Sequence, residues 1–279
     1  MKMSVKRLIT IVMLLAAFVS SSAQTDMGAD PTATGIAEAD KLYNAGEYAK
    51  AIPIYEEVME INGVSAPLLY NLGNACFKAG DFGKATLAYE RALRLDPGNS
   101  TIKNNLSYLR TRIEDQNKAE TRGRKLTVTP DAPSFFAGVY SNITKETSSN
   151  YWALFAAFAF VLVVGSVALY MFTTNVNARK VGFFGALFFL GFCIIFLIFS
   201  FAAAKEYYSK DEGIITAYKV ELRTEPATDA KVSTTPLHSG TRLSVLDTRE
   251  DDKGKTAWYK VRLNSELLGW IEAKDFEII

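Results

Sequence analysis

Two long apolar runs without a charged residue constrain this sequence more than any other feature. They cover residues 151–172 and 181–204. At about 1.5 Å per residue, each run is long enough to cross the ~30 Å hydrocarbon core of a bilayer as a helix. A helix that is apolar on all sides over such a length is rarely the core of a soluble protein. The sequence therefore predicts a two-helix transmembrane hairpin with residues 173–180 as its loop.

The loop and the ends of the two runs agree with a membrane hairpin. The loop contains Arg179 and Lys180 and no acidic residue. Because short basic loops stay in the cytoplasm, we expect both ends of the hairpin to face the extracytoplasmic side. Aromatic residues typical of membrane surfaces lie near the ends of the runs, namely Tyr151, Trp152, Tyr170, Tyr207 and Tyr208.

The N-terminal residues, 1–23, have the three parts of a secretory signal peptide. A basic start is followed by an apolar stretch from Leu8 to Val19, and small residues lead to an expected cleavage after Ala23. The mature chain then begins outside the cytoplasm. This conclusion is independent of the hairpin loop and predicts the same topology.

Composition argues against several classes of function. The net charge of +1 over 279 residues gives no whole-chain reason to expect nucleic acid. The two cysteines, Cys76 and Cys193, fall in separate segments, so we expect no disulfide framework. The one histidine, His238, excludes a metal site built on two histidines, and we expect it to be solvated.

No catalytic constellation is recognisable in the sequence. It has no phosphate-binding glycine loop with a lysine, no Cys/His nucleophile pair and no metal-ligand spacing. We therefore expect a protein that is not an enzyme and that binds no cofactor or metal.

A repeat with a period of 34 residues determines the expected fold of the segment before the hairpin. Residues 44–51 align with residues 78–85, and a third, partial copy begins where Asn105 repeats Asn71. Gly80 lies in the expected turn between two helices, where positive φ costs glycine nothing. Thirty-four residues is the period of the tetratricopeptide (TPR) repeat, a helix–turn–helix unit.

The second copy resembles the TPR family closely, because the residues of its signature lie at the expected positions. The resemblance implies an all-α helical repeat over residues 33–115, with two repeats and a capping helix over about 101–114. The first copy is weaker and has Pro53 inside its second helix, where proline removes a hydrogen bond. The signature residues of the second copy are Leu72, Gly73, Ala85, Tyr89, Ala92 and Pro97.

Two interpretations of this array remain open. It is either a scaffold without a ligand groove of its own or a surface that recognises an extended segment or a helix of a partner. Asn74 and Asn105 resemble the asparagine pair of TPRs that bind a terminal carboxylate, but Tyr70 stands where those TPRs have a lysine. In TPR proteins the inner helix of each pair lines the groove, and by repeat position this implies Tyr70, Asn74, Phe77, Lys78, Asn105, Tyr108 and Arg112.

Residues 116–150 connect the array to the hairpin. Periodicity fades there, and charged residues mix with prolines that break regular structure. A short apolar patch, residues 135–140, lies just before the first membrane run. We expect a linker in which this patch is a candidate for a helix in the membrane interface.

The residues after the hairpin, 213–279, change to short β-rich runs separated by turn clusters. Runs of this length and spacing suit a small closed barrel, because closure removes exposed edges. We therefore expect an all-β barrel. Its predicted strands cover residues 214–222, 242–247, 257–263 and 268–272.

This segment resembles bacterial SH3 (SH3b) domains, and the resemblance implies binding of cell-wall peptides or of proteins. Trp258 and Trp270 each combine a large apolar body with one hydrogen-bond donor, so each suits either a core or a ligand surface. We favour the core for Trp270, and Trp258 remains a possible ligand residue. The matching residues are 220–226, 239–241, 258–261 and 269–271.

The order of these parts is similar to that of the TPR/SH3 member of the bacteroidete aerotolerance (Bat) family, over nearly the whole chain. The resemblance implies a bacterial inner-membrane protein with both soluble domains in the periplasm and a role in stress or envelope maintenance. It also implies protein partners, namely Bat membrane proteins with von Willebrand A-type domains, a further TPR protein and, indirectly, a MoxR-type ATPase.

Functions from different classes are compatible with this organisation. The main hypothesis is an assembly scaffold, in which the TPR groove holds one Bat partner and the SH3b domain holds a second partner or the cell wall. The rival hypothesis is a cell-envelope sensor whose SH3b domain binds peptidoglycan. A weaker third hypothesis is a passive tether for the two domains.

Overall fold

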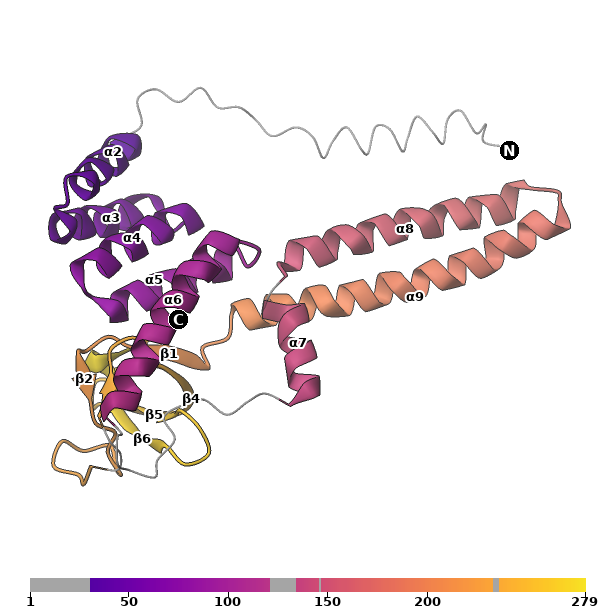
Figure 1. Cartoon of the computed structure of the whole chain (residues 1–279). Helices are drawn as coiled ribbons and strands as arrows, with labels where there is room; N and C mark the ends of the chain where they lie inside the picture. Colours follow the sequence, from indigo (N-terminus) through magenta and orange to yellow (C-terminus); the bar gives the residue numbers. More distant parts are fainter. Residues whose placement is uncertain (1–30, 121–133, 146, 233–235) are drawn as a thin grey trace.

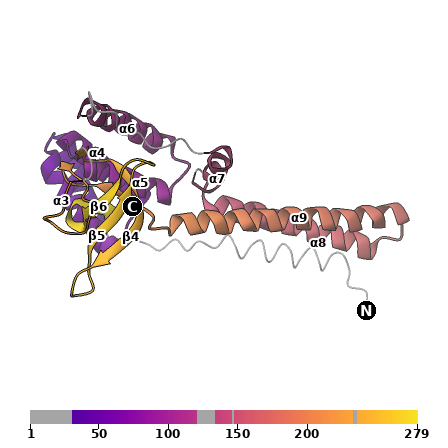
Figure 2. The same cartoon turned by 90° about the horizontal axis from the view of Figure 1, so that it is seen from below.

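The structure, a computed structural model, describes residues 31–120, 134–145, 147–232 and 236–279. It has three parts: an array of helices, a β-sheet, and a long helical hairpin that projects away from the other two (Figure 1 and Figure 2). The expected signal peptide and the middle of the expected linker lie outside the described residues.

The array consists of paired antiparallel helices, as the TPR resemblance predicts. Neighbouring helices share one apolar core, in which Tyr55, Leu72, Tyr89 and Leu106 are buried. The described helices of the array are α2 (Pro31–Asn44), α3 (Tyr48–Asn62), α4 (Ala66–Ala79), α5 (Phe82–Leu95) and α6 (Ser100–Glu120).

The turns of the array repeat at the 34-residue offset. Gly80 ends α4 with a φ of +86°, as predicted for the turn, and Gly46 has a φ of +79° at the equivalent place. Glycine adopts this left-handed conformation without steric cost. Side chains cap two helices of the array. Asp81 accepts a hydrogen bond from the backbone N–H of Lys84 at the start of α5, and Ser65 accepts one from the backbone N–H of Leu68 at the start of α4.

The small residues of the TPR signature allow α4 and α5 to pack closely. A Cβ atom at Gly73 would lie 2.6 Å from Cε1 of Tyr89, well inside van der Waals contact. Ala85 and Ala92 of α5 are fully buried in the same core. Larger side chains at these positions would force the two helices apart.

Two helices of the array need comment. α3 is unbroken and contains Pro53, as predicted. This proline lies near the start of the helix, where only one bond, to the carbonyl of Ala49, is lost. α6 continues to Glu120 rather than ending at residue 115, because no glycine or proline interrupts it.

Helices α8 (Ser149–Phe172) and α9 (Val176–Tyr207) form the predicted hairpin. Both are long and apolar enough to cross a membrane, with a mean hydropathy of 2.4 and 2.7 over their most apolar stretches. Many of their large apolar side chains face outward, as expected for a surface that contacts lipid. The loop is shorter than predicted, because nothing breaks the helix around Arg179 and Lys180, which lie near the start of α9.

Close contacts between α8 and α9 explain part of the glycine content of the hairpin. A Cβ atom at Gly182 would lie 2.7 Å from the carbonyl oxygen of Ser166. The thiol of Cys193 donates a hydrogen bond to the carbonyl of Ala156 over 3.5 Å. Gly191 has no neighbour within 4 Å of a built Cβ, so it does not contribute to this packing.

Helix α7 (Phe135–Lys145) lies inside the expected linker and extends the predicted apolar patch. It packs against α9 and crosses the end of the hairpin nearest the soluble parts (Figure 1). Phe135, Val139 and Tyr140 are exposed on it. This part of the linker is therefore a helix with large apolar side chains on its surface.

The C-terminal part is an antiparallel β-sheet with a small apolar core that includes Ile215, Leu243, Val261 and Ile271. Five strands pair in the order β6-β5-β4-β1-β7, and β2 pairs with β3 separately. The strands are β1 (Glu212–Ile215), β2 (Lys219–Val220), β3 (Leu237–His238), β4 (Arg242–Glu250), β5 (Thr256–Arg262), β6 (Leu268–Glu272) and β7 (Phe276–Ile278), with a short 3-10 helix, η1 (Ala273–Asp275), before β7.

The sheet differs from the prediction in the number and continuity of its strands. The predicted strand over residues 214–222 is two short strands, and β3 and β7 are additional. The described strand pairs form one five-stranded sheet and one two-stranded sheet, with a bridge from Arg223 to Trp270. Closure into a barrel stays a prediction.

The β-sheet docks on the repeat array, and glycine brings the two backbones together from both sides. A Cβ atom at Gly83 of α5 would lie 2.9 Å from the carbonyl oxygen of Ile215 and from Cα of Thr216. Gly240, in the turn between β3 and β4, has a φ of +85°, and a Cβ there would lie 2.9 Å from Oγ1 of Thr86. The two soluble parts are thus in direct contact.

A buried asparagine on the extended end of α6 joins the same interface. Asn117 is 3% exposed, donates to Oγ1 of Thr241 over 2.9 Å and accepts from the backbone N–H of His238 over 2.9 Å. Buried polar groups of this kind need partners, and here the partners lie across the interface. His238, expected in solvent, is instead buried because β3 packs against α6.

Replacing Gly83 by alanine tests the docking. Helix propensity alone favours alanine by about 1 kcal/mol, whereas the added Cβ would press on the backbone of β1 and cost ~1–3 kcal/mol. We expect Gly83→Ala to loosen the contact, measured as faster amide hydrogen exchange in β3 and its turn in the full chain in nanodiscs. Gly138→Ala is the matched control, because Gly138 is also helical but has no neighbour within 4 Å. Unchanged exchange in Gly83→Ala would contradict the docking.

Candidate functional site

A group of three hydrogen-bonded side chains links the helices of the first repeat to the next. The hydroxyl of Tyr55 donates to Oδ1 of Asp40 over 2.5 Å, and the amide of Asn71 donates to the same oxygen over 3.5 Å. The group therefore joins α2, α3 and α4. Burial, followed by the hydrogen bond to Asp40, raises the pKa of the Tyr55 hydroxyl above its usual range.

The second repeat contains the same group, shifted by 34 residues. The hydroxyl of Tyr89 donates to Oδ1 of Asn74 over 2.7 Å, and the amide of Asn105 donates to that oxygen over 3.1 Å. Asn105 also donates to the hydroxyl of Tyr70 over 3.4 Å. Burial raises the pKa of the Tyr89 hydroxyl as well. The repeated group ties the first helix of each repeat to the first helix of the next.

These bonds give the predicted asparagine pair a structural role. Asn74 and Asn105 lie together, but they bond to each other and to aromatic hydroxyls. Oδ1 of Asn74 already accepts two hydrogen bonds from within the fold. The geometry therefore adds nothing in favour of a terminal carboxylate ligand, which the absence of a lysine at Tyr70 already disfavours.

Aromatic contacts on the array repeat with the same period. Tyr43 and Tyr48 meet edge to face with their ring centroids 5.2 Å apart, and Phe77 and Phe82, one period later, stack at 5.9 Å. Phe77 also meets Tyr108 of α6 edge to face at 6.0 Å. Such pairs contribute about 0.5–1.5 kcal/mol beyond burial, so they fix the aromatic surface in place.

Three of the predicted groove residues are exposed, namely Lys78, Tyr108 and Arg112. The guanidinium of Arg112 lies 5.4 Å from the centre of the Phe82 ring, within the range of a cation–π contact. The result is an accessible aromatic and basic surface formed by α4, α5 and α6, which we call the inner-face patch. The other predicted residues of this face are half-buried, namely Tyr70, Asn74, Phe77 and Asn105.

The groove residues predicted from the sequence do not include Phe82 and Tyr89, which also belong to this face of the array. Phe82 contacts two predicted residues, and Tyr89 reaches Asn74 from the outer helix of its pair. A signal for them is present, because Asp40 and Tyr55 precede Asn74 and Tyr89 by one period. Comparing polar and aromatic positions between the two copies would have identified these pairs.

A pocket of about 320 Å³ lies on the β-sheet, between β2, β5 and β6. Trp258 and Trp270 both line it and both are half-buried, so Trp270 is not purely a core residue. Nζ of Lys260 lies 5.9 Å from the centre of the Trp270 ring. Burial raises the pKa of Asp275, which also lines the pocket, although the neighbouring Lys274 opposes this shift. This second surface, the sheet pocket, combines aromatic and charged side chains.

Two observations concern metal-ligating and nucleophilic side chains among the described residues. Within them, no group of three or more His, Cys, Asp or Glu side chains is arranged to hold a metal ion. Cys76 is fully buried on α4, and burial raises the pKa of its thiol to about 12. The thiolate is therefore scarce at neutral pH in the folded protein.

The fold and its two surfaces define a class of protein in which one chain joins a TPR-type array to an SH3-type sheet. Comparison with known families agrees with this class. The family described as Tetratricopeptide repeat matches residues 66–99, the second copy of the repeat, and the family described as Bacterial SH3 domain matches residues 219–277. No curated protein matches the chain. Both modules are of a kind that binds other proteins.

Removing the central acceptor of the second hydrogen-bonded group should destabilise the array. Asn74→Ala leaves the buried Tyr89 hydroxyl without its acceptor, at a cost of ~1–3 kcal/mol in the free energy of unfolding. We expect the double variant Asn74→Ala/Tyr89→Phe to lose less than the two single variants together. Pulse proteolysis of the full chain in urea and detergent measures these differences. The exposed Asn104→Ala is the control, and equal stability of Asn74→Ala and Asn104→Ala would refute the structural role.

The raised pKa of the Cys76 thiol predicts that this residue reacts slowly with alkylating reagents in the folded protein. Because a raised thiol pKa means that the folded state keeps its proton, alkylation by iodoacetamide at pH 8 should be at least about tenfold slower than in the unfolded chain. Peptide mapping by mass spectrometry, before and after denaturation, follows Cys76 specifically. Rapid labelling in the native protein would show that the residue is not buried as described.

Proposed function

We propose that this protein is a membrane-anchored extracytoplasmic scaffold that binds one partner on the TPR array and another on the SH3b domain. One observation favours this function above all. The side chains of the inner-face patch and the residues that line the sheet pocket take no part in the docking contacts of Gly83, Asn117 and Gly240, to which Phe82 contributes only its backbone carbonyl. Docking therefore leaves both surfaces accessible at the same time.

The anchor in this proposal is the hairpin of α8 and α9. Arg179 and Lys180 lie close to its turn, and the basic end of a hairpin stays in the cytoplasm. We infer two spans of a bacterial inner membrane, a short cytoplasmic turn, and both soluble modules in the periplasm. A signal peptide over residues 1–23 leads to the same orientation.

The chemistry of the inner-face patch indicates what kind of partner segment fits it. Phe77 and Tyr108 offer aromatic surface, and Lys78 and Arg112 add positive charge. A segment with apolar side chains flanked by acidic residues would be complementary. We therefore favour recognition of an internal segment or helix of a partner over capture of a terminal carboxylate.

The proposed partners follow from the similarity of the whole arrangement to the TPR/SH3 member of the Bat family. They are other membrane proteins, chiefly von Willebrand A-type and TPR proteins of a stress or aerotolerance complex, with a MoxR-type ATPase as an indirect partner. In this proposal the protein assembles the complex and is not an enzyme. It uses no cofactor and binds no nucleic acid.

A second candidate function is a cell-envelope sensor. The sheet pocket favours it, because a cavity of about 320 Å³ lined by Trp258 and Trp270 suits the stacking of a sugar or a peptide of peptidoglycan. Trp258→Ala in the full chain should then weaken binding to purified sacculi at least about tenfold. If sacculi retain the wild type and this variant equally, the pocket is not a cell-wall site.

Crosslinking in intact cells tests the scaffold proposal directly. A photoreactive residue at Lys78 or Arg112 should crosslink to a von Willebrand-type or TPR membrane protein, identified by mass spectrometry. The control position is Glu57, which is exposed on α3, away from the inner-face patch. Crosslinks at Trp258 to cell-wall material, with none at Lys78 and Arg112, would replace the scaffold by the sensor.

A further inference from the structure

A cavity of about 720 Å³ lies where the repeat array, the β-sheet and the membrane hairpin meet. Its walls come from α5 and α6, from the start of β1 and β4, and from the adjoining ends of α8 and α9. None of the predicted partner-binding residues lines it. The cavity, which we call the juxtamembrane cavity, is therefore a separate candidate site.

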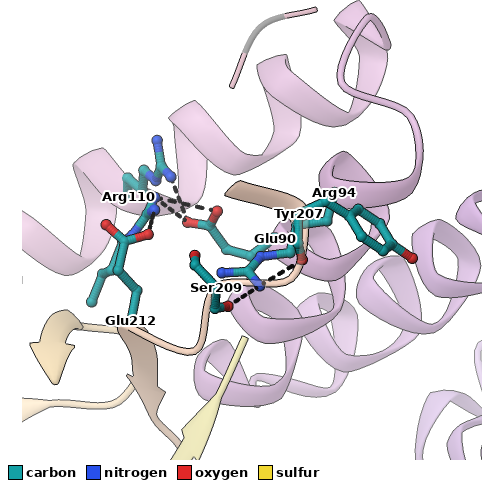
Figure 3. Close-up of polar contacts among 7 residues, drawn as sticks. Glu90, Arg94, Arg110, Tyr207, Ser209 and Glu212 are labelled. Carbon is teal, nitrogen blue, oxygen red and sulfur yellow. Dashed lines mark hydrogen bonds and ion pairs between the residues drawn. The ribbon is translucent and has the colours of Figure 1, made fainter. Parts of the chain in front are cut away.

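Ion pairs fix the wall of this cavity on the side of the sheet. Glu90 of α5 is 7% exposed and pairs with Arg110 and with Arg242, the latter over 3.3 Å, and Arg242 also pairs with Glu212. Figure 3 shows the carboxylate of Glu90 directed toward Arg110. A buried carboxylate is stable only when it is paired in this way, so these arginines are held in position.

The wall on the side of the hairpin is fixed by Arg94. Its guanidinium donates to the carbonyl of Ser209 over 2.7 Å and to the carbonyl of Tyr207 over 3.3 Å (Figure 3). These carbonyls belong to the end of α9 and to the chain that leaves it. Arg94 thus holds the exit of the hairpin against α5, beside the cavity.

The charges of the lining favour an anion. Among its described residues, the cationic side chains are Arg94, Lys103, Arg110 and Arg242, and the acidic ones are Glu90 and Glu212. Hydroxyl groups of Ser148 and Ser149 add neutral donors. The N-terminus of α8 opens on the same cavity, and its dipole adds positive potential.

The surroundings of the cavity correspond to the headgroup layer of a membrane. Tyr208 is 77% exposed and lies on the cavity wall, where α9 has just ended. Phe135 of α7 is 78% exposed, and α7 crosses the base of the hairpin (Figure 1). A helix with this exposed apolar surface suits the boundary of headgroups and acyl chains, and Tyr is enriched at the same depth.

We propose that the juxtamembrane cavity binds the headgroup of an anionic phospholipid, with its phosphate on the arginine and lysine side chains. The proposal rests on the membrane placement given under the proposed function. Guanidinium groups bind phosphate through paired hydrogen bonds, and the serine hydroxyls suit a glycerol headgroup. The acyl chains would lie along the apolar surface of α9. The lipid would couple the membrane to the interface between the two modules.

Native mass spectrometry of the full chain, released from nanodiscs of equal phosphatidylcholine and phosphatidylglycerol, tests this proposal. We expect the wild type to retain phosphatidylglycerol in preference to phosphatidylcholine. Lys103→Gln and Arg94→Gln should each lower this retention about fivefold, the effect of about one cationic side chain near a membrane surface. Lys118→Gln is the control, because it removes a lysine from the same helix outside the cavity. Lys103→Arg should retain the lipid.

Several outcomes would overturn the proposal. The first is that the wild type retains both lipids equally. The second is that Lys103→Gln and Lys118→Gln retain phosphatidylglycerol equally. The third is that inorganic phosphate alone displaces the lipid. The last result would make free phosphate the ligand. Hydrogen exchange at the docking interface shows whether the variants remain folded.

Failure of the lipid site is distinguishable from failure of the scaffold. If the chain stays in the membrane fraction and crosslinks to partners at Lys78 without selecting a lipid, the lipid proposal alone is wrong. If the chain does not enter the membrane at all, the proposed function fails with it.

Discussion

Close approach at two glycines, Gly83 on α5 and Gly240 in the turn after β3, determines how the soluble parts of this protein are arranged. Backbone meets backbone at both positions, so neither module can rotate without losing close packing. Asn117 adds two buried hydrogen bonds beside it, and Arg91 reaches the carbonyl of Ile278 over 2.7 Å at the other end of the sheet. Several elements of each module therefore take part in the docking, which sets the distance between the inner-face patch and the sheet pocket in this structure.

The repeat array obtains its rigidity differently, from one hydrogen-bonded group used twice. Asp40 and Asn74 each accept from a buried tyrosine of their own repeat and from an asparagine of the next. The polar side-chain atoms of Asp40, Asn74 and Asn105 on the groove side are therefore largely hydrogen-bonded within the fold. In the proposed function, recognition by this array would depend instead on the aromatic and basic side chains around Phe77 and Arg112, whose mutual contacts are already made in the free protein.

Sequence alone predicted the features that arise from local periodicity. The 34-residue offset predicted the helix pairs and the turn at Gly80, and the uncharged apolar runs predicted the helical hairpin. The docking interface was not predictable in this way, because Gly83 and Asn117 have no unusual feature until β3 and its turn lie against them. Strands as short as β3 and β7 depend on the same tertiary contacts. The predicted groove residues do lie on one face, but the internal bonding of Asn74 became evident only when Tyr89 was placed beside it.

In the proposed placement, in which α8 and α9 span the membrane, the anchor would also set the orientation of the docked modules. The exit of α9 is bonded to α5 through Arg94, and the sheet begins at Glu212, only a few residues later. So short a connection leaves the docked body little freedom to move away from the bilayer. In that placement the inner-face patch and the sheet pocket would lie at a defined height above the membrane. Partners that are themselves membrane proteins would meet these surfaces at matching heights, which favours assembly within one membrane over capture of freely diffusing proteins.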